Sequence, residues 1–394
     1  MSMNDVVIIS ACRTAIGSLG GQFRSITALD LSIPVMQGLV SRAGIDPAII
    51  DDVVWGCNYQ RTYKENNLAR VALVKAGLPV SVPGVTIHRN CTSSMSSIQM
   101  GYYQIRAGEG DCIMAGGGES MSTAPHMAFG LRDGRRFGDV ALRDSMWDSL
   151  TNLGIGPAMG ITAENVARRC GITREEQDRY ALLSQQRAAA AQDAGRFRDE
   201  IVPVTVTGKK GDAVYDTDEY PRRGVTLEAL QRLKPSFLEG GTVTAGNASG
   251  MNDAASGVLL MSRRKADELG LKPMARLVST AVTGIEPEIM GLGPVEASWK
   301  ALKKAGLTLG DLDLIEVNEA FAAQYLGCEK ELGLNREITN VNGSGISLGH
   351  PVGASGCRLV VTLLYELARR GGRYGLATLC AGGGMGTALV VERL

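Results

Sequence analysis

The chain has 394 residues, and its 41 lysines and arginines balance its 41 aspartates and glutamates. This balance excludes a protein that is drawn to nucleic acid or to a membrane by its overall charge, so an anionic ligand must be met by local charge. A chain of this length is too long to pack around one ordinary hydrophobic core, which predicts two packed domains or a duplicated one.

Cysteines, histidines and apolar runs bear on cellular location, membrane insertion and metal binding. The eight cysteines have no Cys-x-x-Cys spacing, and residues 1–10 are too short and unflanked for a signal peptide, which predicts reduced thiols and a cytoplasmic location. No apolar run approaches the roughly 20 residues that span a bilayer. With three histidines and no paired ligand spacing, we expect no metal site.

Strands and helices alternate through the first part of the chain. Apolar runs predict strands at residues 6–10, 52–56, 85–88 and 111–118, and intervening runs predict helices at residues 29–43, 70–77 and 93–107. Cys91 falls between one of these strands and the helix that follows it. Such alternation predicts an α/β fold with a mostly parallel sheet.

Residues 120–242 differ in composition from the segments on either side. Residues 132–138 are polar and rich in turn formers, and Thr162 is a candidate N-cap for one helix. Thr173 and Glu176 have the spacing of a capping box that opens another helix. These features predict a domain inserted between two halves.

The C-terminal part of the chain repeats features of the N-terminal part. The glycine triplet at residues 116–118 ends an apolar strand and recurs at residues 382–384. The apolar strand at residues 52–55 recurs at residues 313–316, at a closely similar offset. Two echoes in the same order predict an internal duplication.

Residues 342–358 form the most unusual stretch of the chain, with five glycines, Pro351 and His350. A helix is predicted at residues 359–370, with its leucines on one face. A glycine-rich turn that leads into a buried helix directs backbone N–H groups and a positive dipole end at a ligand. Taken alone, the turn slightly favours a structural interpretation, in which His350 is simply a buried histidine.

Further segments change this interpretation. Cys91 in residues 88–95, His350 and Cys380 in residues 379–386 each lie beside small residues at the junction of two elements, as a nucleophile, a base and an acid would. With Asn318 in residues 317–322, and with residues 244–253, they resemble the signature motifs of the thiolases. The resemblance runs from Val6 to Arg393, with the motifs in the family's order.

The resemblance implies a fold and a division of the chain. It implies two duplicated βαβαβ halves in a five-layered α/β/α/β/α sandwich with the site between them. Residues 1–119 and 243–272 would form the N-terminal half, and residues 273–394 the C-terminal half. Residues 120–242 would form a loop domain that covers coenzyme A and helps to build a homotetramer, a dimer of dimers.

The resemblance also implies catalytic roles. Cys91 would be the nucleophile and His350 its base, and Asn318 would join His350 in an oxyanion hole. The backbone N–H groups of Cys91 and Gly382 would form a second oxyanion hole, and Cys380 would move a proton at the α-carbon. A helix N-terminus and a nearby imidazole are expected to lower the pKa of Cys91 by roughly one to several units.

Some of these residues also fit purely structural roles. Without the resemblance, Cys380 beside a glycine turn fits a structural role better than a catalytic one. Five further cysteines fit buried core positions better than catalytic ones, namely Cys12, Cys57, Cys112, Cys170 and Cys328.

The expected substrates are acyl-CoA thioesters, with no cofactor and no metal. The residues expected to line the pantetheine and acyl pocket are Leu150, Met159, Phe237, Ala245, Ser249, Met290 and Phe321. Arg222 is the candidate to stack on adenine or to bind a phosphate, because a guanidinium suits both tasks. An exposed, solvated arginine is the competing interpretation and is nearly as well supported.

The sequence departs from the family pattern near the nucleophile. His88 stands where thiolases usually have Asn, three positions before Cys91. Residues 92–94 are Thr-Ser-Ser in place of smaller residues, and Ala158 precedes Met159 where many acetyl-specific members have His. These departures put the shape of the pocket and the length of the acyl chain in doubt.

The leading interpretation is an acetyl-CoA C-acetyltransferase that works through an S-acyl Cys91 intermediate. A 3-ketoacyl-CoA thiolase for longer or branched chains is the alternative within the family. A non-catalytic acyl or sterol carrier is disfavoured because Cys91, Asn318, His350 and Cys380 are all present. A nucleotide-phosphate binder fails because the chain has no P-loop and no dinucleotide-binding glycine motif.

Overall fold

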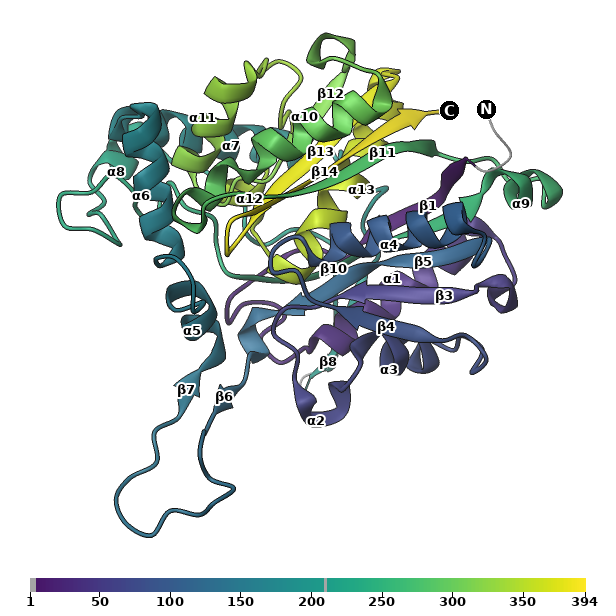
Figure 1. Ribbon diagram of the computed structural model, residues 1–394, viewed down its shortest axis with the longest axis horizontal. Helices are drawn as coiled ribbons and strands as arrows, with labels where there is room; N and C mark the ends of the chain where they lie inside the picture. Colours follow the sequence, from purple (N-terminus) through teal and green to yellow (C-terminus); the bar gives the residue numbers. More distant parts are fainter. Residues whose placement is uncertain (1–4, 209–210) are drawn as a thin grey trace.

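A mixed sheet is the central feature of the computed structural model, which describes residues 5–208 and 211–394. Within these residues the sheet has ten strands in the order β12-β13-β14-β11-β1-β10-β5-β3-β4, with β2 paired to β10 (Figure 1). The strands are β1 (Val6–Arg13), β2 (Gly17–Ser18), β3 (Asp52–Gly56), β4 (Gly84–Ile87), β5 (Cys112–Ser120), β10 (Asn252–Ser262), β11 (Ala275–Gly284), β12 (Leu314–Val317), β13 (Tyr374–Ala381) and β14 (Met385–Arg393).

The sheet consists of two halves that meet at β1 and β11. Residues 6–8 pair with residues 275–277, and this short antiparallel ladder is the junction. β3 pairs in parallel with β4 and β5, and β12 pairs in parallel with β13, but β1, β10, β11 and β14 pair antiparallel. The prediction of a mostly parallel sheet is therefore wrong for the centre. At β13–β14 the cause is the three-residue turn, which can join only antiparallel neighbours.

Helices cover both faces of the sheet and fill the space between its halves, which gives the five layers that were expected (Figure 1). α1 (Ala28–Ala43) and α3 (Leu68–Lys75) cover the outer face of the N-terminal half. α4 (Ser93–Ala107) and α13 (Val352–Arg370) form the middle layer. α10 (Gly293–Ala305) and α11 (Ala322–Leu332) cover the outer face of the C-terminal half. The order β1-α1-β3-α4-β5-β10 recurs as β11-α10-β12-α13-β13-β14, as duplication predicts.

The helix after the glycine-rich stretch begins earlier than predicted. α13 starts at Val352 instead of residue 359, so Gly353 and Gly356 lie inside it, and every residue to Leu364 is buried. A Cβ at Gly356 would lie 2.7 Å from the Cβ of Met95 on α4. Glycine costs about 1 kcal/mol relative to alanine within a helix. Here it allows the two middle helices to pack closely, a requirement that local sequence does not reveal.

The two glycine triplets are not equivalent, which corrects the predicted echo. Residues 116–118 lie inside β5, fully buried in the sheet, whereas residues 382–384 form the turn between β13 and β14. A Cβ at Gly116 would lie 2.7 Å from the Trp55 ring, so this triplet serves close packing. The echo between residues 52–55 and 313–316 is sounder, because β3 and β12 hold matching places in the two halves.

Residues 121–251 contain most of the elements outside the layers. They are β6 (His126–Met127), β7 (Arg143–Asp144), α5 (Ser145–Thr151), α6 (Met159–Cys170), α7 (Arg174–Asp193), β8 (Val204–Gly208), β9 (Gly211–Tyr215) and α8 (Leu227–Gln231). The Thr173–Glu176 capping box opens α7, as predicted. The prediction for Thr162 is wrong, because α6 begins at Met159 and the Thr162 hydroxyl donates to the Met159 carbonyl inside the helix.

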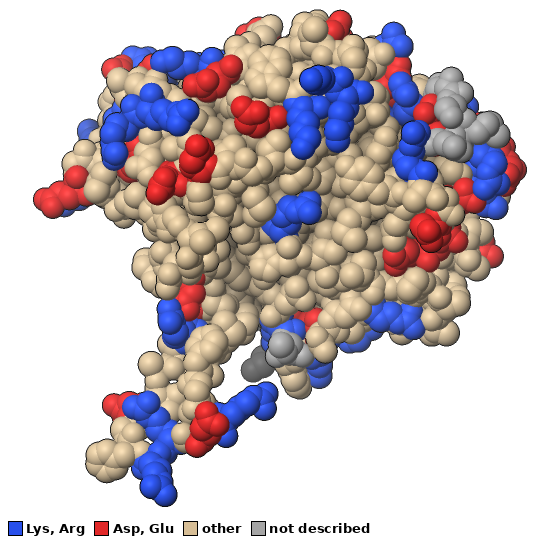
Figure 2. All heavy atoms as spheres, viewed as in Figure 1, with Lys and Arg blue, Asp and Glu red and all other residues tan. Residues whose placement is uncertain are grey.

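An arm, residues 128–142 between β6 and β7, projects from the body of the molecule (Figure 1). Residues 129–143 are all exposed, and Phe137 is 95% exposed. Basic side chains gather on the arm (Figure 2), among them Arg132, Arg135 and Arg136. Among the described helices, none combines the length and apolarity needed to cross a membrane. The division of the chain into residues 1–119 with 243–272, 120–242 and 273–394 stays a prediction.

Candidate active site

Cys91 lies in the turn that joins β4 to α4. The three residues after it are buried although they are more polar than the family pattern, and their hydroxyl groups all find partners. Thr92 donates to the Arg89 carbonyl and Ser93 to the Asn90 carbonyl, both at 2.7 Å. Ser94 accepts from the backbone N–H of Cys357 on α13 at 3.0 Å. The hydroxyl groups of residues 92–94 therefore fit the turn because each one forms a hydrogen bond with a backbone group.

The Cys91 thiol is held in an environment that keeps it neutral. Burial raises the pKa of Cys91 to about 11, although hydrogen bonds from the backbone N–H groups of Gly382 and of Cys91 itself act to lower it. The expected lowering of this pKa is therefore wrong, because desolvation of the thiolate outweighs the two donors. The resting group at pH 7 is a thiol.

The raised pKa predicts how Cys91 reacts with alkylating agents. Cys91 is the only one of the eight cysteines, all of which the structure describes, that is not buried. Because the thiolate is the reactive form, its alkylation by iodoacetamide should rise about tenfold per pH unit between pH 7 and pH 10. Peptide mass spectrometry after timed alkylation measures this rate. A rate that levels off near pH 7 would instead indicate a preformed thiolate.

His350 lies between the short helix α12 (Gly345–Leu348) and α13. Its backbone N–H donates to Asn252 Oδ1 at 2.9 Å, and its Nδ1 lies 2.7 Å from Ser355 Oγ. The Ser355 hydroxyl donates its one proton to the Pro351 carbonyl, so Ser355 accepts from Nδ1–H. This arrangement assigns the tautomer in which Nε2 is unprotonated and free to act as a base.

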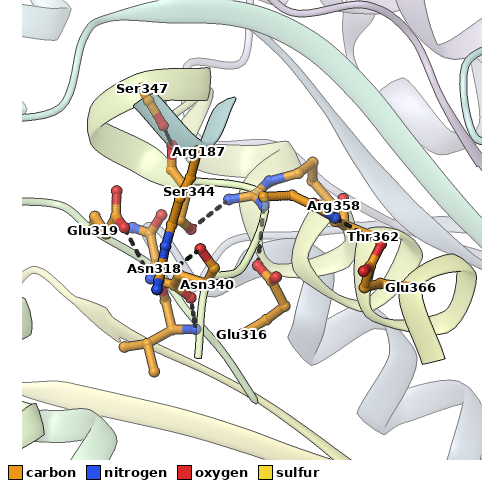
Figure 3. A network of polar contacts seen from close by, with 12 residues as sticks. Arg187, Glu316, Asn318, Glu319, Asn340, Ser344, Ser347, Arg358, Thr362 and Glu366 are labelled. Atoms are coloured by element: carbon orange, nitrogen blue, oxygen red, sulfur yellow. Dashed lines mark hydrogen bonds and ion pairs between the residues drawn. The ribbon is translucent and has the colours of Figure 1, made fainter. Parts of the chain in front are cut away.

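Burial lowers the pKa of His350 to about 3, and the positive charge of Arg358 lowers it further. In the free enzyme the imidazole is therefore neutral throughout the physiological range. Arg358 is itself buried, with Nη1 lying 3.6 Å from Glu316 Oε2 and Nη2 donating to Ser344 Oγ at 3.1 Å (Figure 3). The Arg358 side chain thus connects β12 with the glycine-rich turn that carries His350.

Asn318 follows β12 directly, and its Nδ2 lies 3.4 Å from both ring nitrogens of His350. Asn340 holds the backbone beside it, since its Oδ1 accepts from the Val317 N–H at 2.8 Å and its Nδ2 donates to Glu319 Oε1 at 3.0 Å (Figure 3). A Cβ at Gly345 would lie 2.8 Å from Asn318 Oδ1. Glycine at that position lets the turn approach Asn318 closely.

Cys380 is buried near the end of β13. Burial raises the pKa of Cys380 well above its usual range, and negative charge on Cys91 or Cys328 would raise it further. Asn90, the residue before Cys91, donates from Nδ2 to the carbonyl of Gly382, two residues after Cys380, at 2.7 Å. Gly382 follows in the turn to β14, and a Cβ there would lie 3.2 Å from Met159 Sδ. The structure thus brings Cys91, Cys380 and Gly382 together across the two halves.

A cavity of about 370 Å³, the inner cavity, opens beside these residues and is lined by His350. Cys91 packs against Met121 and Val352, which are both part of its wall. Five of the predicted pocket residues line it, namely Leu150, Met159, Phe237, Ser249 and Phe321. A wider outer groove of about 590 Å³ shares part of this wall and is lined by Ala245 and Arg222 as well.

Two of the predicted binding residues, Met290 and Arg222, lie away from the inner cavity. Met290 lines neither the inner cavity nor the outer groove; it lies in the short 3₁₀ helix Pro287–Leu292 and packs in the core beside α6 and α11, and its role in binding stays a prediction. Arg222 is exposed and lies over the Tyr220 ring at 5.5 Å, so both of its interpretations stay open. Among the described residues, no three His, Cys, Asp or Glu side chains are grouped so as to hold a metal ion.

Comparison with protein families decides the identity of this site. The thiolase N-terminal domain matches residues 6–264, and the thiolase C-terminal domain matches residues 271–393. The chain belongs to the thiolase family.

Individual thiolases match the chain over nearly its full length. The acetyl-CoA acetyltransferase of Chromobacterium violaceum is 54% identical over 391 residues, which are 99% of this chain and 100% of that protein. The crystal structure of the Bacillus anthracis acetyl-CoA acetyltransferase has a TM-score of 0.97 at 47% identity, over 99% of both chains. The human mitochondrial 3-ketoacyl-CoA thiolase in complex with CoA has a TM-score of 0.95 at 44% identity, over 100% of this chain and 98% of that one. The expected family and fold are confirmed.

Three residues of this thiolase site were not identified from the sequence. Ser355 and Asn252 orient His350, and Asn90 contacts Gly382. Ser355 lies in the first turn of α13, five residues after His350, and Asn252 lies within the motif at residues 244–253. Both segments therefore stood out in the sequence, but the sequence did not show that these two side chains contact His350. Asn90 precedes the nucleophile, but its partner lies far away in sequence.

Proposed function

We propose that this thiolase is an acetyl-CoA acetyltransferase, which joins two acetyl-CoA molecules into acetoacetyl-CoA and coenzyme A and also catalyses the reverse reaction. The observation that carries the proposal is the Cys91 thiol, which packs against the wall of a cavity lined by a neutral His350, with Gly382 held nearby through Asn90. The acetyl-CoA acetyltransferases among its relatives support the choice of acetyl group.

The first half of the reaction forms an acyl-enzyme on Cys91. As the sulfur attacks the thioester carbonyl of acetyl-CoA, the thiol proton passes to His350 Nε2. The N–H groups of Cys91 and Gly382 then stabilise the oxyanion. When the carbon–sulfur bond to coenzyme A breaks, the leaving thiolate takes the proton of Cys380. The raised pKa of Cys91 and the lowered pKa of His350 favour proton transfer during the attack over a preformed ion pair.

The second half makes the carbon–carbon bond. The Cys380 thiolate removes a proton from the methyl carbon of a second acetyl-CoA, while His350 and Asn318 stabilise the enolate oxygen. The carbanion attacks the acetyl group on Cys91, the bond to sulfur breaks, and the Cys91 thiolate regains its proton from His350. Asn318 Oδ1 is buried and accepts no hydrogen bond from the described residues, which leaves it able to orient a water beside the enolate.

Coenzyme A fits the outer groove, with its acyl end in the inner cavity. The two spaces share Phe237, Ser249 and neighbouring residues, so a long, narrow ligand can run through both. Arg222 and Tyr220 line the outer groove, where an adenine ring or a phosphate would lie. The free thiols support a cytoplasmic enzyme, and the substrates themselves are the only coenzyme required.

A 3-ketoacyl-CoA thiolase for longer chains is the second candidate. The inner cavity has a wall of methionines and aromatic side chains, and the small Ala158 forms part of it. Such a wall can accommodate more methylene groups than an acetyl group requires, at about 0.8 kcal/mol for each one buried. The human 3-ketoacyl-CoA thiolase matches the chain at 44% identity, slightly below the 47% of the Bacillus anthracis acetyl-CoA acetyltransferase.

Thiolysis rates over a series of 3-ketoacyl-CoA substrates should distinguish the two candidates. We expect kcat/KM to be highest for acetoacetyl-CoA and to fall by at least about tenfold at six carbons, since one methylene that fits poorly changes binding by about 1–3 kcal/mol. Ala158→His should steepen the fall by filling the inner cavity. A maximum at six carbons or longer in the unaltered enzyme would establish the second candidate.

We also propose a homotetramer, a dimer of dimers. The arm carries Phe129, Leu131, Phe137 and Leu142 exposed to solvent, and such apolar side chains are typical of a contact surface. Light scattering at micromolar concentration should give four times the mass of the chain, and Phe137→Asp should lower it to a dimer. A monomer for the unaltered protein would contradict the proposal.

A further inference from the structure

The side chain of Asn90 connects the turn that carries the nucleophile with the turn between β13 and β14. Its Nδ2 donates to the Gly382 carbonyl at 2.7 Å, across the boundary between the two halves. The backbone of Asn90 has φ +46°, in the left-handed region, which asparagine tolerates better than other residues with a Cβ.

His88 orients the amide of Asn90. Its Nε2 lies 2.9 Å from Asn90 Oδ1, and since that oxygen only accepts, Nε2 carries the donated proton. The amide is therefore held at both ends, with its oxygen toward His88 and its nitrogen toward Gly382. His88 occupies the position where the sequence departs from the usual thiolase pattern, so this contact belongs to the local character of this chain.

The position of Gly382 matters because its backbone N–H, as well as its carbonyl, lies at the site. The Gly382 N–H and the Cys91 N–H are the two proposed donors of the oxyanion hole, and both act to lower the pKa of Cys91. The Gly382 carbonyl is held by the residue that precedes Cys91. One short connection therefore sets the distance between two donors that come from opposite halves. Oxyanion-hole donors must lie about 2.7–3.1 Å from the same oxygen. A misplacement of about 1 Å in an active site can cost about 10²-fold in rate.

We propose that Asn90 is a positioning residue that fixes the oxyanion hole of the acyl-enzyme, and that His88 holds its amide in the required orientation. The inference rests on the proposed roles of Cys91 and Gly382. Asn90 need not contact the substrate, because it acts through the Gly382 peptide.

Substitutions that keep the shape of the side chain test this role. Asn90→Asp removes the donor and places an acceptor against the Gly382 carbonyl. Asn67→Asp is the matched control, because Asn67 also has a left-handed backbone, with φ +58°, and donates from Nδ2 to a glycine carbonyl, that of Gly84, at 2.9 Å. His88→Ala removes the orienting donor, and His88→Gln supplies a replacement donor.

Three readouts separate positioning from a general loss of stability. The rate at which acetyl-CoA acetylates Cys91 should fall about 10–100-fold in Asn90→Asp, with KM changed less than about twofold. The thioester carbonyl stretch of the acetyl-enzyme, measured by infrared difference spectroscopy with ¹³C-labelled acetyl groups, should move to higher frequency as its hydrogen bonds lengthen. His88→Ala should show a slower acetylation and a higher carbonyl frequency, both to a smaller extent than Asn90→Asp. His88→Gln should return the rate and the frequency toward those of the unaltered enzyme, and Asn67→Asp should leave both at those values.

The outcomes that would overturn the proposal differ from those that would overturn the proposed function. If the unaltered enzyme forms acetyl-Cys91 and Asn90→Asp forms it as fast, with the same carbonyl frequency, Asn90 has no positioning role. If the unaltered enzyme forms no acetyl-Cys91, the proposed function itself fails. Should Asn90→Asp not fold, His88→Ala and His88→Gln decide, and equal rates in both would contradict the proposal.

Discussion

Replacing Cys380 with alanine should abolish condensation and thiolysis while Cys91 still becomes acetylated, though more slowly. Only the carbon–carbon step strictly requires a proton to move at the α-carbon, whereas Cys380 merely assists departure of coenzyme A in the first step. General acid–base catalysis contributes about 10²–10⁴-fold, so steady-state rates should fall by at least that much. Exchange of the acetyl methyl protons with solvent deuterium, followed by NMR, should stop as well.

Cys328→Ala is a suitable control for this substitution. Cys328 is another buried thiol in the C-terminal half, on α11, where it donates to the Gly291 carbonyl at 3.2 Å. Its loss should lower stability without selecting one step of the reaction. A loss of less than about tenfold in Cys380→Ala would be too small for an acid or base. Cys380 would then be a structural cysteine at the glycine turn, and His350 would be the next candidate for the base.

Replacing Cys91 with alanine should abolish every step, including acyl-enzyme formation. No other cysteine among the eight, all within the described residues, is exposed enough to replace it. Removal of the nucleophile from another enzyme that works by covalent catalysis costs about 10⁶-fold, and a loss on that order is expected here. Intact mass after incubation with acetyl-CoA should show no added acetyl group. Cys170→Ala, at the end of α6, should acetylate like the unaltered enzyme, and an acetylated, active Cys91→Ala would refute the assignment.

Local patterns predicted the elements around the nucleophile well. α4 spans residues 93–107 as predicted, because an apolar face and a glycine C-cap at Gly108 define it within its own sequence. The capping box of α7 and the strand β3 were likewise set by neighbouring residues. The start of α13 was not predictable in this way, since Gly353 and Gly356 read as a turn until the packing of α4 against them is known.

Burial and distance account for what the sequence analysis could not supply. The motif around Cys91 predicted a lowered pKa, but desolvation by both halves of the protein raises it to about 11. The Asn90–Gly382 contact joins residues from opposite halves, and no local signal marks it. The catalytic residues came from the resemblance, while their geometry came from the fold.

The location of the acetyl group tests the central claim most directly. The unaltered enzyme should be incubated with acetyl-CoA, quenched in acid, weighed intact and then digested for peptide mapping. The proposed mechanism predicts one added acetyl group per chain, on the peptide that contains Cys91. An acetyl group on Cys380, or no acetyl group on any cysteine, would contradict it.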